Sequence, residues 1–219
     1  MNWTSAMTRR AAAGLAALGL WLAATATGAQ TAAPKPEGFA DMARALEPGP
    51  LPELSVGDKA GVPMIEYGSV TCTHCAHFDK EVWPAIKAAY VDTGKVRYIF
   101  REYSRNSLDV GAFMLARCNG DDKALATIEL LFATQDQWAF VDKPLDGLVD
   151  VLKQTGLTRD KIETCLKDQG KADALVNIVK TADQNFAVKG TPTFIIDGKI
   201  YGGALSKDEL DAILKPLVK

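Results

Sequence analysis

Two cysteines stand three residues apart, as Cys72-Thr73-His74-Cys75, at the junction between a predicted strand and a predicted helix. The preceding run, residues 62–70 (VPMIEYGSV), is short and apolar and ends in small residues, which indicates a buried strand. From Cys72 onward, apolar residues recur at helical spacing as far as residue 90, although Pro84 should interrupt that helix. The placement predicts a mixed α/β chain in which a buried strand leads directly into a helix that begins at a thiol.

The start of a helix is a favourable place for a thiolate. The first N–H groups there have no partner within the helix, and the helix dipole is positive at that end. We therefore expect the pKa of Cys72 to be lowered. Cys75 lies about one helical turn away, close enough to resolve a mixed disulfide, and the imidazolium or N–H of His74 would stabilise the thiolate further. A stabilised thiolate favours the reduced form, so the disulfide would be oxidising.

Three other interpretations of the pair remain open. Cys72 and Cys75 could form an inert structural disulfide. They could be half of a zinc site, although the chain has only two histidines and no second CxxC to complete one. They could also bind a soft ion such as Cu(I), with help from His74 or His77.

The composition is that of a globular protein. The chain has 219 residues, of which 47% are hydrophobic and 24% charged, so it can bury a substantial core. Its 25 basic and 27 acidic residues give a net charge of −2. This balance argues against a nucleic-acid partner, which would require a basic surface.

Residues 1–29 have the pattern of a secretory signal peptide. Arg9 and Arg10 precede an apolar run from Ala11 to Ala26, and small residues follow. An uncleaved anchor is the alternative, but this run is shorter than the roughly 20 residues that a spanning helix needs. We expect cleavage near Ala29 and export to the periplasm, an oxidising compartment in which disulfides persist.

The pattern changes several times after the leader. Residues 30–58 hold five prolines and predict a mostly irregular extension with one helical turn near residues 40–46. Residues 95–100 (KVRYIF) predict a second strand. From about residue 105 to 170 the pattern is helical throughout, with Ser107 and Thr158 as caps and Gly170 as the end of the fourth helix.

The last fifty residues return to a mixed pattern. A long helix with an apolar face reaches Phe186. Residues 193–196 and 199–202 then predict two strands, joined by Asp197-Gly198, a dipeptide typical of a type I′ hairpin turn. Ser206 and Glu209 form a capping box for the final amphipathic helix.

Taken in this order, the motifs resemble the thioredoxin-fold thiol:disulfide oxidoreductases, specifically the DsbA-like group. The resemblance rests on IEYGSVTCTHCAHF, on the helical block after the second strand, on GTPTFIIDGK (residues 190–199) after a long helix, and on the closing helix. It covers residues 58–219. It implies a thioredoxin fold, formed by residues 59–104 and 171–219, with residues 105–170 as an inserted all-helical domain.

The resemblance also implies roles for particular residues. Thr191-Pro192 would be a cis peptide bond in a loop that lies against the CxxC and pairs with substrate; an ordinary trans bond is the alternative. Glu66 would be a buried acid with a raised pKa that assists proton transfer at the resolving cysteine, rather than a surface or ion-paired residue. The family permits a second disulfide between Cys118 and Cys165, which could instead be two buried free thiols.

We therefore expect an exported thiol:disulfide oxidase. Its substrates would be reduced or misfolded secreted proteins, and in the family a membrane quinone-linked partner usually reoxidises the pair. We expect no organic cofactor, no metal and no nucleic acid, and a monomer. The alternatives are a disulfide isomerase or reductase that uses the same pair, and a Cu(I) carrier or a chaperone on the same fold.

Overall fold

The computed structural model describes residues 32–218. The signal peptide predicted at residues 1–29, with its cleavage site near Ala29, lies outside the described residues. Among the helices of residues 32–218, none is both long enough and apolar enough to cross a membrane.

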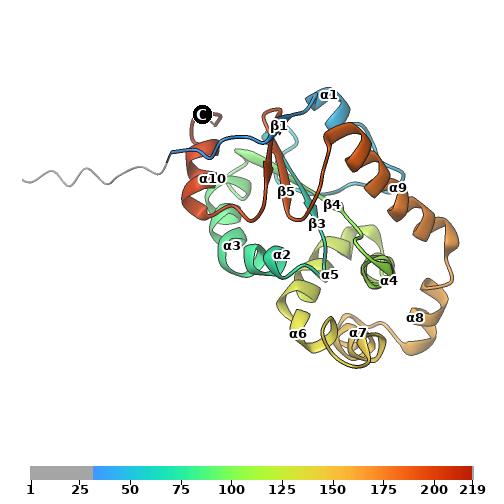
Figure 1. Cartoon of the computed structure of the whole chain (residues 1–219). Coiled ribbons are helices and arrows are strands. Elements are labelled where there is room, and N and C mark those ends of the chain that lie inside the picture. The colour runs from blue at the N-terminus through green and yellow to red at the C-terminus, as the bar shows by residue number, and fades with distance from the viewer. Residues whose placement is uncertain (1–31, 219) are drawn as a thin grey trace, which may run out of the picture.

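The described residues form one six-stranded mixed sheet in the order β1-β6-β5-β3-β4-β2 (Figure 1). The strands are β1 (Gly38–Phe39), β2 (Leu54–Val56), β3 (Val62–Gly68), β4 (Val96–Glu102), β5 (Thr193–Ile196) and β6 (Lys199–Gly202). Only β3 and β4 run parallel to each other, because the helix that carries the CxxC pair crosses over between them. In the central strand, Glu66 is flanked by Phe100 on β4 and Phe194 on β5.

The crossover after β3 is helical but not uniformly α-helical. It consists of α2 (Thr73–His77), a π-helical segment (Phe78–Val82), α3 (Trp83–Ile86) and a second π-helical segment (Lys87–Val91). Pro84 lies in the first turn of α3, directly after the first π-helical segment. This agrees with the interruption expected at Pro84, whose ring and missing N–H disfavour continuous α-helical bonding.

The remaining helices follow the predicted order with some corrections. They are α1 (Met42–Ala45), α4 (Ser107–Ala116), α5 (Asp121–Ala133), α6 (Gln135–Trp138), α7 (Pro144–Leu152), α8 (Arg159–Cys165), α9 (Gln169–Phe186) and α10 (Lys207–Leu214). Asn106 rather than Ser107 caps α4, because its Oδ1 accepts from Asp109 N at 2.9 Å. Thr158 caps α8 as predicted, but α8 ends at Cys165, and Gly170 lies inside the first turn of α9.

The segment at residues 30–58 is mostly irregular over its described part, residues 32–58, as predicted. The helical turn expected near residues 40–46 is present as α1, but the segment also adds an edge strand at each end of the sheet. β1 pairs with β6 and β2 pairs with β4, both antiparallel. Strands of two and three residues are too short to show an alternating pattern. The prolines around them also argue against a strand, so the sequence does not predict these two.

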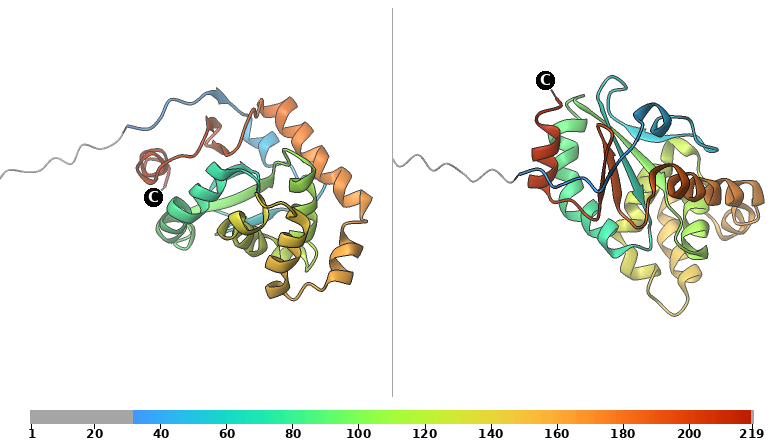
Figure 2. Two further views of the ribbon diagram at one scale, coloured as in Figure 1. Left: turned by 60° about the horizontal axis from the view of Figure 1, so that its bottom comes forward. Right: turned by 45° about the horizontal axis from the view of Figure 1, so that its top comes forward.

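Helices cover both faces of the sheet. Figure 2, in its right-hand view, shows α10 and the helices after β3 on one side of the sheet and α9 on the other. The apolar residues agree: Met64 packs in the core that contains the CxxC pair, whereas Ile65 packs in a second cluster with Ala45 of α1 and Phe186 of α9. Successive side chains of a strand point to opposite faces, so β3 contributes to both cores.

The local signals after α9 are confirmed. Asp197 and Gly198 both have positive φ, 50° and 71°, as a type I′ turn requires. Ser206 and Glu209 form the reciprocal capping box at the start of α10. These features depend on neighbouring residues only, which is why the sequence predicts them.

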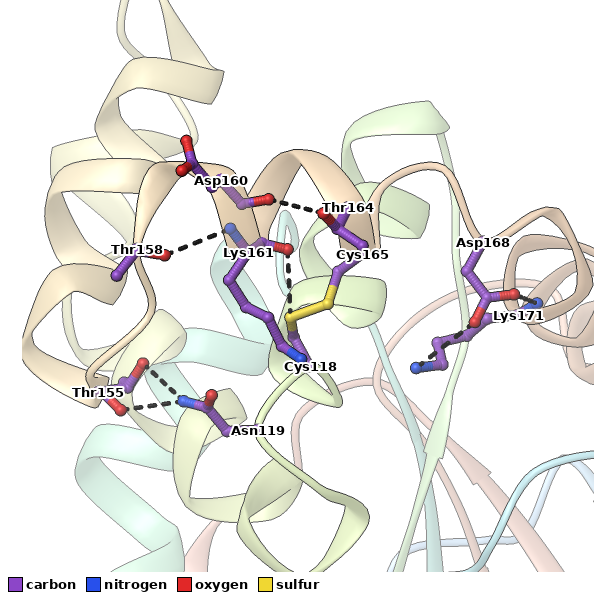
Figure 3. The surroundings of a disulfide bond; sticks show 10 residues. All are labelled: Cys118, Asn119, Thr155, Thr158, Asp160, Lys161, Thr164, Cys165, Asp168 and Lys171. Carbon is purple, nitrogen blue, oxygen red and sulfur yellow. Dashed lines mark hydrogen bonds and ion pairs between the residues drawn. A yellow bond between two sulfur atoms is a disulfide. The ribbon is translucent and has the colours of Figure 1, made fainter.

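The structure joins Cys118, just after α4, to Cys165, the last residue of α8, by a disulfide (Figure 3). The two Cα atoms are 6.0 Å apart, and the residues are separated by 47 positions. Close by, Asn119 Nδ2 donates to the carbonyl of Thr155 at 2.9 Å. Closing a loop of this length contributes about 4 kcal/mol by chain entropy, so the disulfide fastens the two ends of the helical insertion together.

Candidate active site

Cys72 is the N-cap residue of α2 and lies against the loop before β5. Its backbone is extended, with φ −89° and ψ 120°, and its Sγ donates to the carbonyl of Thr191 at 3.2 Å. The Thr191-Pro192 bond is cis, as the resemblance implied. Both thiols are reduced in this structure; Cys72 is 4% exposed and Cys75 is fully buried. Cys72 is therefore the more accessible of the two cysteines, although only a small part of its surface is exposed.

The surroundings shift the pKa values of the two thiols in opposite directions. The Cys75 side chain is the largest influence on the Cys72 pKa, as a hydrogen-bond donor to the Cys72 sulfur. Together with the Thr191 side chain and the backbone N–H groups of Cys75 and His74, it outweighs burial and lowers the Cys72 pKa from 9.0 to about 5. Burial raises the pKa of Cys75 well above its ordinary value, and its hydrogen bond to Cys72 adds to this. The pair thus carries one thiolate at neutral pH, on Cys72.

His74 contributes through its backbone. Its side chain is exposed, and within residues 32–218 its imidazole makes no hydrogen bond or ion pair. Its N–H is one of the groups that lower the pKa of Cys72. The stabilisation that the sequence suggests from the His74 imidazole stays a prediction.

Thr191 has two polar atoms near Cys72, a carbonyl oxygen that suits the thiol and a hydroxyl that suits the thiolate. The carbonyl accepts the hydrogen bond of the thiol. The hydroxyl is buried and has no hydrogen-bond partner among the described residues, and a donor from Thr191 favours the thiolate. The loop itself is held by two further bonds, from Thr193 Oγ1 to Gly190 O and from Gly203 N to Pro192 O, each 2.8 Å long.

We expect Thr191→Val to raise the pKa of Cys72 by about one unit, because it removes a hydrogen-bond donor to a charged group and conserves the shape of the side chain. The ultraviolet absorbance of the thiolate, followed against pH, measures the shift. Thr93→Val removes a remote hydroxyl that donates to Ala89 O and should leave the Cys72 titration unchanged. An unchanged titration in Thr191→Val would show that the hydroxyl does not act on the thiolate.

One buried acid, Glu66, and one half-buried acid, Asp79, lie near the redox pair. Glu66 is 1% exposed, and Tyr98 Oη donates to its Oε2 at 2.8 Å. Burial raises the pKa of Glu66 to about 8, and its charge contributes to the raised pKa of Cys75. Burial, helped by the nearby Glu129, also raises the pKa of Asp79 to about 7. The prediction that Glu66 is buried with a raised pKa is confirmed.

Sequence reasoning missed Asp79 and Tyr98. Asp79 follows Cys75 by four residues, so helical spacing places both on the same face, and this signal could have found it. Tyr98 lies on β4 and pairs in register with Met64 on β3. That neighbour relation becomes visible only once the parallel pairing of the two strands is known.

The helical insertion holds the loop between β3 and α2 from two sides. Asp109, in α4, accepts from Ser69 Oγ at 2.9 Å and from Thr71 N at 2.9 Å. Gln135, the first residue of α6, is buried, and its Nε2 donates to the carbonyls of Val70, at 2.7 Å, and Cys72, at 3.0 Å. The residues in these contacts are about 40 to 65 positions apart in the sequence, so no local pattern predicts them.

Gln135 therefore positions the backbone of Cys72, and we expect Gln135→Leu to raise the Cys72 pKa by about half a unit to one unit. In this variant the carbonyls of Val70 and Cys72 lose their donor. The partial negative charge of these carbonyl oxygens is then no longer balanced near the thiolate, which disfavours the charged form. Gln154→Leu is the matched control, because Gln154 Nε2 donates to Val151 O within the same insertion and does not touch the redox loop. A loss of stability in Gln135→Leu with an unchanged Cys72 titration would contradict this role.

Within the described part of the chain, no group of three or more His, Cys, Asp or Glu side chains is arranged to hold a metal ion. His77, one of the residues considered for a soft ion, is exposed on α2.

The chain matches known proteins over most of its length. A family model described as thioredoxin matches residues 52–216. The solved structure of alpha-DsbA1 from Wolbachia pipientis superimposes with a TM-score of 0.71 at 29% identity, covering 80% of this chain and 94% of that one. A Rickettsia conorii protein that carries the name protein-disulfide oxidoreductase is 32% identical over 146 residues, 64% of this chain and 51% of the relative. A Bacillus cereus protein that carries the name disulfide bond formation protein D is 26% identical over 168 residues, 74% of this chain and 75% of that protein.

The chain belongs to the thioredoxin family and is DsbA-like within it. The mixed sheet with its helical insertion is the thioredoxin fold with the inserted helical domain that the sequence predicts. The chain spans about half the length of the Rickettsia relative that it matches.

Proposed function

We propose that this protein is an exported protein thiol:disulfide oxidase that introduces disulfides through Cys72 and Cys75. The observation that carries the proposal is the asymmetry of the pair: the Cys72 pKa is lowered to about 5, and that of the buried Cys75 is raised. A low thiolate pKa stabilises the reduced form and makes the corresponding disulfide an oxidant. The similarity to alpha-DsbA1 supports the same assignment.

In the proposed reaction the oxidised pair takes two electrons from two substrate thiols. A substrate thiolate attacks Cys72 Sγ, the Cys72–Cys75 bond breaks, and Cys75 leaves as a thiolate that takes up a proton. The second substrate thiolate then attacks the substrate sulfur of the mixed disulfide, and Cys72 leaves as a thiolate. One proton thus stays on Cys75 and one goes to solvent, while the substrate gains a disulfide and the enzyme pair becomes reduced.

The proposed roles of the surrounding residues follow from their positions. Thr191 stabilises the departing Cys72 thiolate, because its hydroxyl has no other partner among the described groups. Glu66 delivers the proton to Cys75, because it is buried, its charge influences that thiol, and its pKa of about 8 keeps it protonated at neutral pH. Pro192 shapes the loop that faces the pair and would receive an extended substrate segment.

The proposal includes the setting in which the protein works. We propose export by the leader at residues 1–29, action on reduced or misfolded proteins in the periplasm, and reoxidation by a membrane redox partner. The disulfide between Cys118 and Cys165 supports an oxidising compartment, since such bonds rarely persist in the cytosol.

Oxidative refolding of a reduced, unfolded substrate protein tests the function. We expect the oxidised protein to transfer one disulfide per molecule to the substrate within the mixing time of a manual assay, and to stop there until an oxidant is supplied. Rapid reduction of a disulfide substrate by the dithiol form, without transfer in the oxidising direction, would identify a reductase instead. Retention of stoichiometric copper after gel filtration, without disulfide transfer, would identify a copper carrier.

A further inference from the structure

A pocket lies on the face of the sheet opposite the redox pair. Its volume is about 290 Å³, and it is enclosed by the segment that follows α1, by β3 and β4, and by the C-terminal half of α9. In Figure 1, α1 and α9 lie on the far side of the sheet from α2 and α3. The segment that forms its rim, Glu47 to Pro50, belongs to the stretch that the sequence predicts to be irregular.

A buried arginine with unused hydrogen-bonding capacity lines this pocket. The Arg101 side chain is 10% exposed, and its Nε has no partner among the described residues. Its Nη2 reaches Glu47 O and Glu53 Oε2, both at 3.5 Å, the long limit for a hydrogen bond. Arg97 binds the other carboxylate oxygen of Glu53. A guanidinium has five N–H donors, so most of those of Arg101 remain available.

The residues around Arg101 leave room for a ligand atom and add a second donor. A Cβ at position 49 would lie 3.2 Å from Arg101 Nη1, so Gly49 keeps the approach to the guanidinium free of side-chain atoms. Tyr67 pairs in register with Arg101 across β3 and β4 and lines the same pocket. Tyr90 and Tyr98 donate their hydroxyls to carboxylates, but the Tyr67 hydroxyl has no such acceptor within residues 32–218.

The remaining lining is mixed. Ile178 and Phe186 of α9 provide apolar walls, while Arg44 adds a second cation and Glu47 one acid at the rim. The formal charge of the lining residues is therefore positive by one. An apolar-walled cavity with a few convergent donors is the usual form of a small-molecule site, and this volume is at the small end of the range.

We propose that this pocket binds a small organic monoanion, a carboxylate on a compact apolar or aromatic body. The carboxylate would accept from the Arg101 guanidinium and the Tyr67 hydroxyl, and the apolar body would lie against Phe186. The site is separate from the redox pair and does not depend on the proposed oxidase function.

Titration of the purified protein with sodium benzoate at constant ionic strength tests the site, with backbone amide chemical shifts as the readout. We expect saturable binding with Kd on the order of 1 mM, with the shift changes confined to residues 44–50 and 178–186 and to the ends of β3 and β4. Benzamide, which has the same shape without the charge, should bind at least about tenfold more weakly.

Variants decide whether the named residues carry the binding. Arg101→Met should abolish saturation, and Tyr67→Phe, which removes one hydroxyl only, should weaken benzoate about threefold to tenfold. Arg159→Met, at an exposed arginine of the helical insertion, should bind like the unmodified protein. Cys72→Ser should also bind benzoate normally, which separates this site from the redox function.

Several outcomes would overturn the proposal. They are the absence of saturable shifts in the unmodified protein, equal affinity for benzamide, and unchanged benzoate affinity in Arg101→Met. If Arg101→Met does not fold, Tyr67→Phe decides alone, and unchanged affinity in that variant would contradict the site.

Discussion

Replacing Cys72 by serine is expected to reduce disulfide transfer to the uncatalysed rate. The serine oxygen cannot form the disulfide from which electrons are accepted, and the remaining Cys75 is fully buried with a raised pKa, so it cannot take over the exchange. Oxidative refolding of a reduced substrate measures the loss. The fold should remain intact, because the change replaces sulfur by oxygen in one side chain.

Cys75→Ser separates the two thiols. This variant keeps the Cys72 thiolate, so with a disulfide-bearing reagent it should form a mixed disulfide that no neighbouring thiol resolves. Mass spectrometry should therefore find a stable adduct on Cys72. Transfer at the normal rate by Cys72→Ser, or an adduct located at Cys118 or Cys165, would contradict the assignment of Cys72 as the attacked sulfur.

Arg117→Met is expected to destabilise the protein by about 3–5 kcal/mol, the largest effect that we predict on stability. Arg117 is 4% exposed and binds Glu102 through Nε at 2.5 Å and Nη2 at 2.7 Å, while Nη2 also donates to Pro52 O at 3.0 Å. Removing the guanidinium leaves Glu102, which is 1% exposed, without its compensating charge. The midpoint of urea unfolding measures the change.

The loss of stability in Arg117→Met should arise because Glu102 stays buried without a compensating charge. Removing a cation from an exposed ion pair should not have this effect. Lys153→Met is the matched control, since Lys153 and its partner Asp150 are 64% and 71% exposed at the side chain. Exposed pairs contribute little, so this variant should stay within about 0.5 kcal/mol. Equal unfolding midpoints for Arg117→Met and the unmodified protein would show that the pair does not hold β4 to the insertion.

The reduction potential of the pair should depend on pH in two regimes. Below about pH 5 both thiols of the reduced form are protonated, so two protons accompany two electrons and the potential falls by about 59 mV per pH unit. Above that value Cys72 stays a thiolate, because its pKa is lowered to about 5, and the slope falls to about 30 mV per unit. A single slope of about 59 mV from pH 4 to pH 8 would contradict the lowered pKa.

The sequence predicts the parts of this site that depend on neighbouring residues. A short apolar run, a thiol and a helical pattern place Cys72 at the start of α2. The turn at Asp197-Gly198 and the capping box at Ser206 are likewise local. In each case the residues that determine the conformation are within a few positions of one another. The burial of Glu66 in β3 was implied by the resemblance to the DsbA-like group and not by the residues around it.

The parts that could not be predicted depend on contacts between distant segments. Gln135 reaches Val70 and Cys72 across more than 60 positions, and Asp109 reaches Ser69 across 40. Both polar side chains lie within helices of the insertion, where a solvent-exposed position is the ordinary expectation for such residues. Their burial follows from the packing of the insertion on the redox loop, which no periodicity encodes.

The most direct test of the central claim is the equilibrium of the Cys72–Cys75 pair with glutathione at pH 7. The Cys118–Cys165 disulfide stays in place, and alkylation followed by mass spectrometry reads the oxidation state of Cys72. DsbA has a potential of about −120 mV and thioredoxin about −270 mV. The pair should have a potential toward −120 mV if the protein is an oxidase with a stabilised Cys72 thiolate. A potential near −270 mV would contradict the oxidase function and identify a reductant.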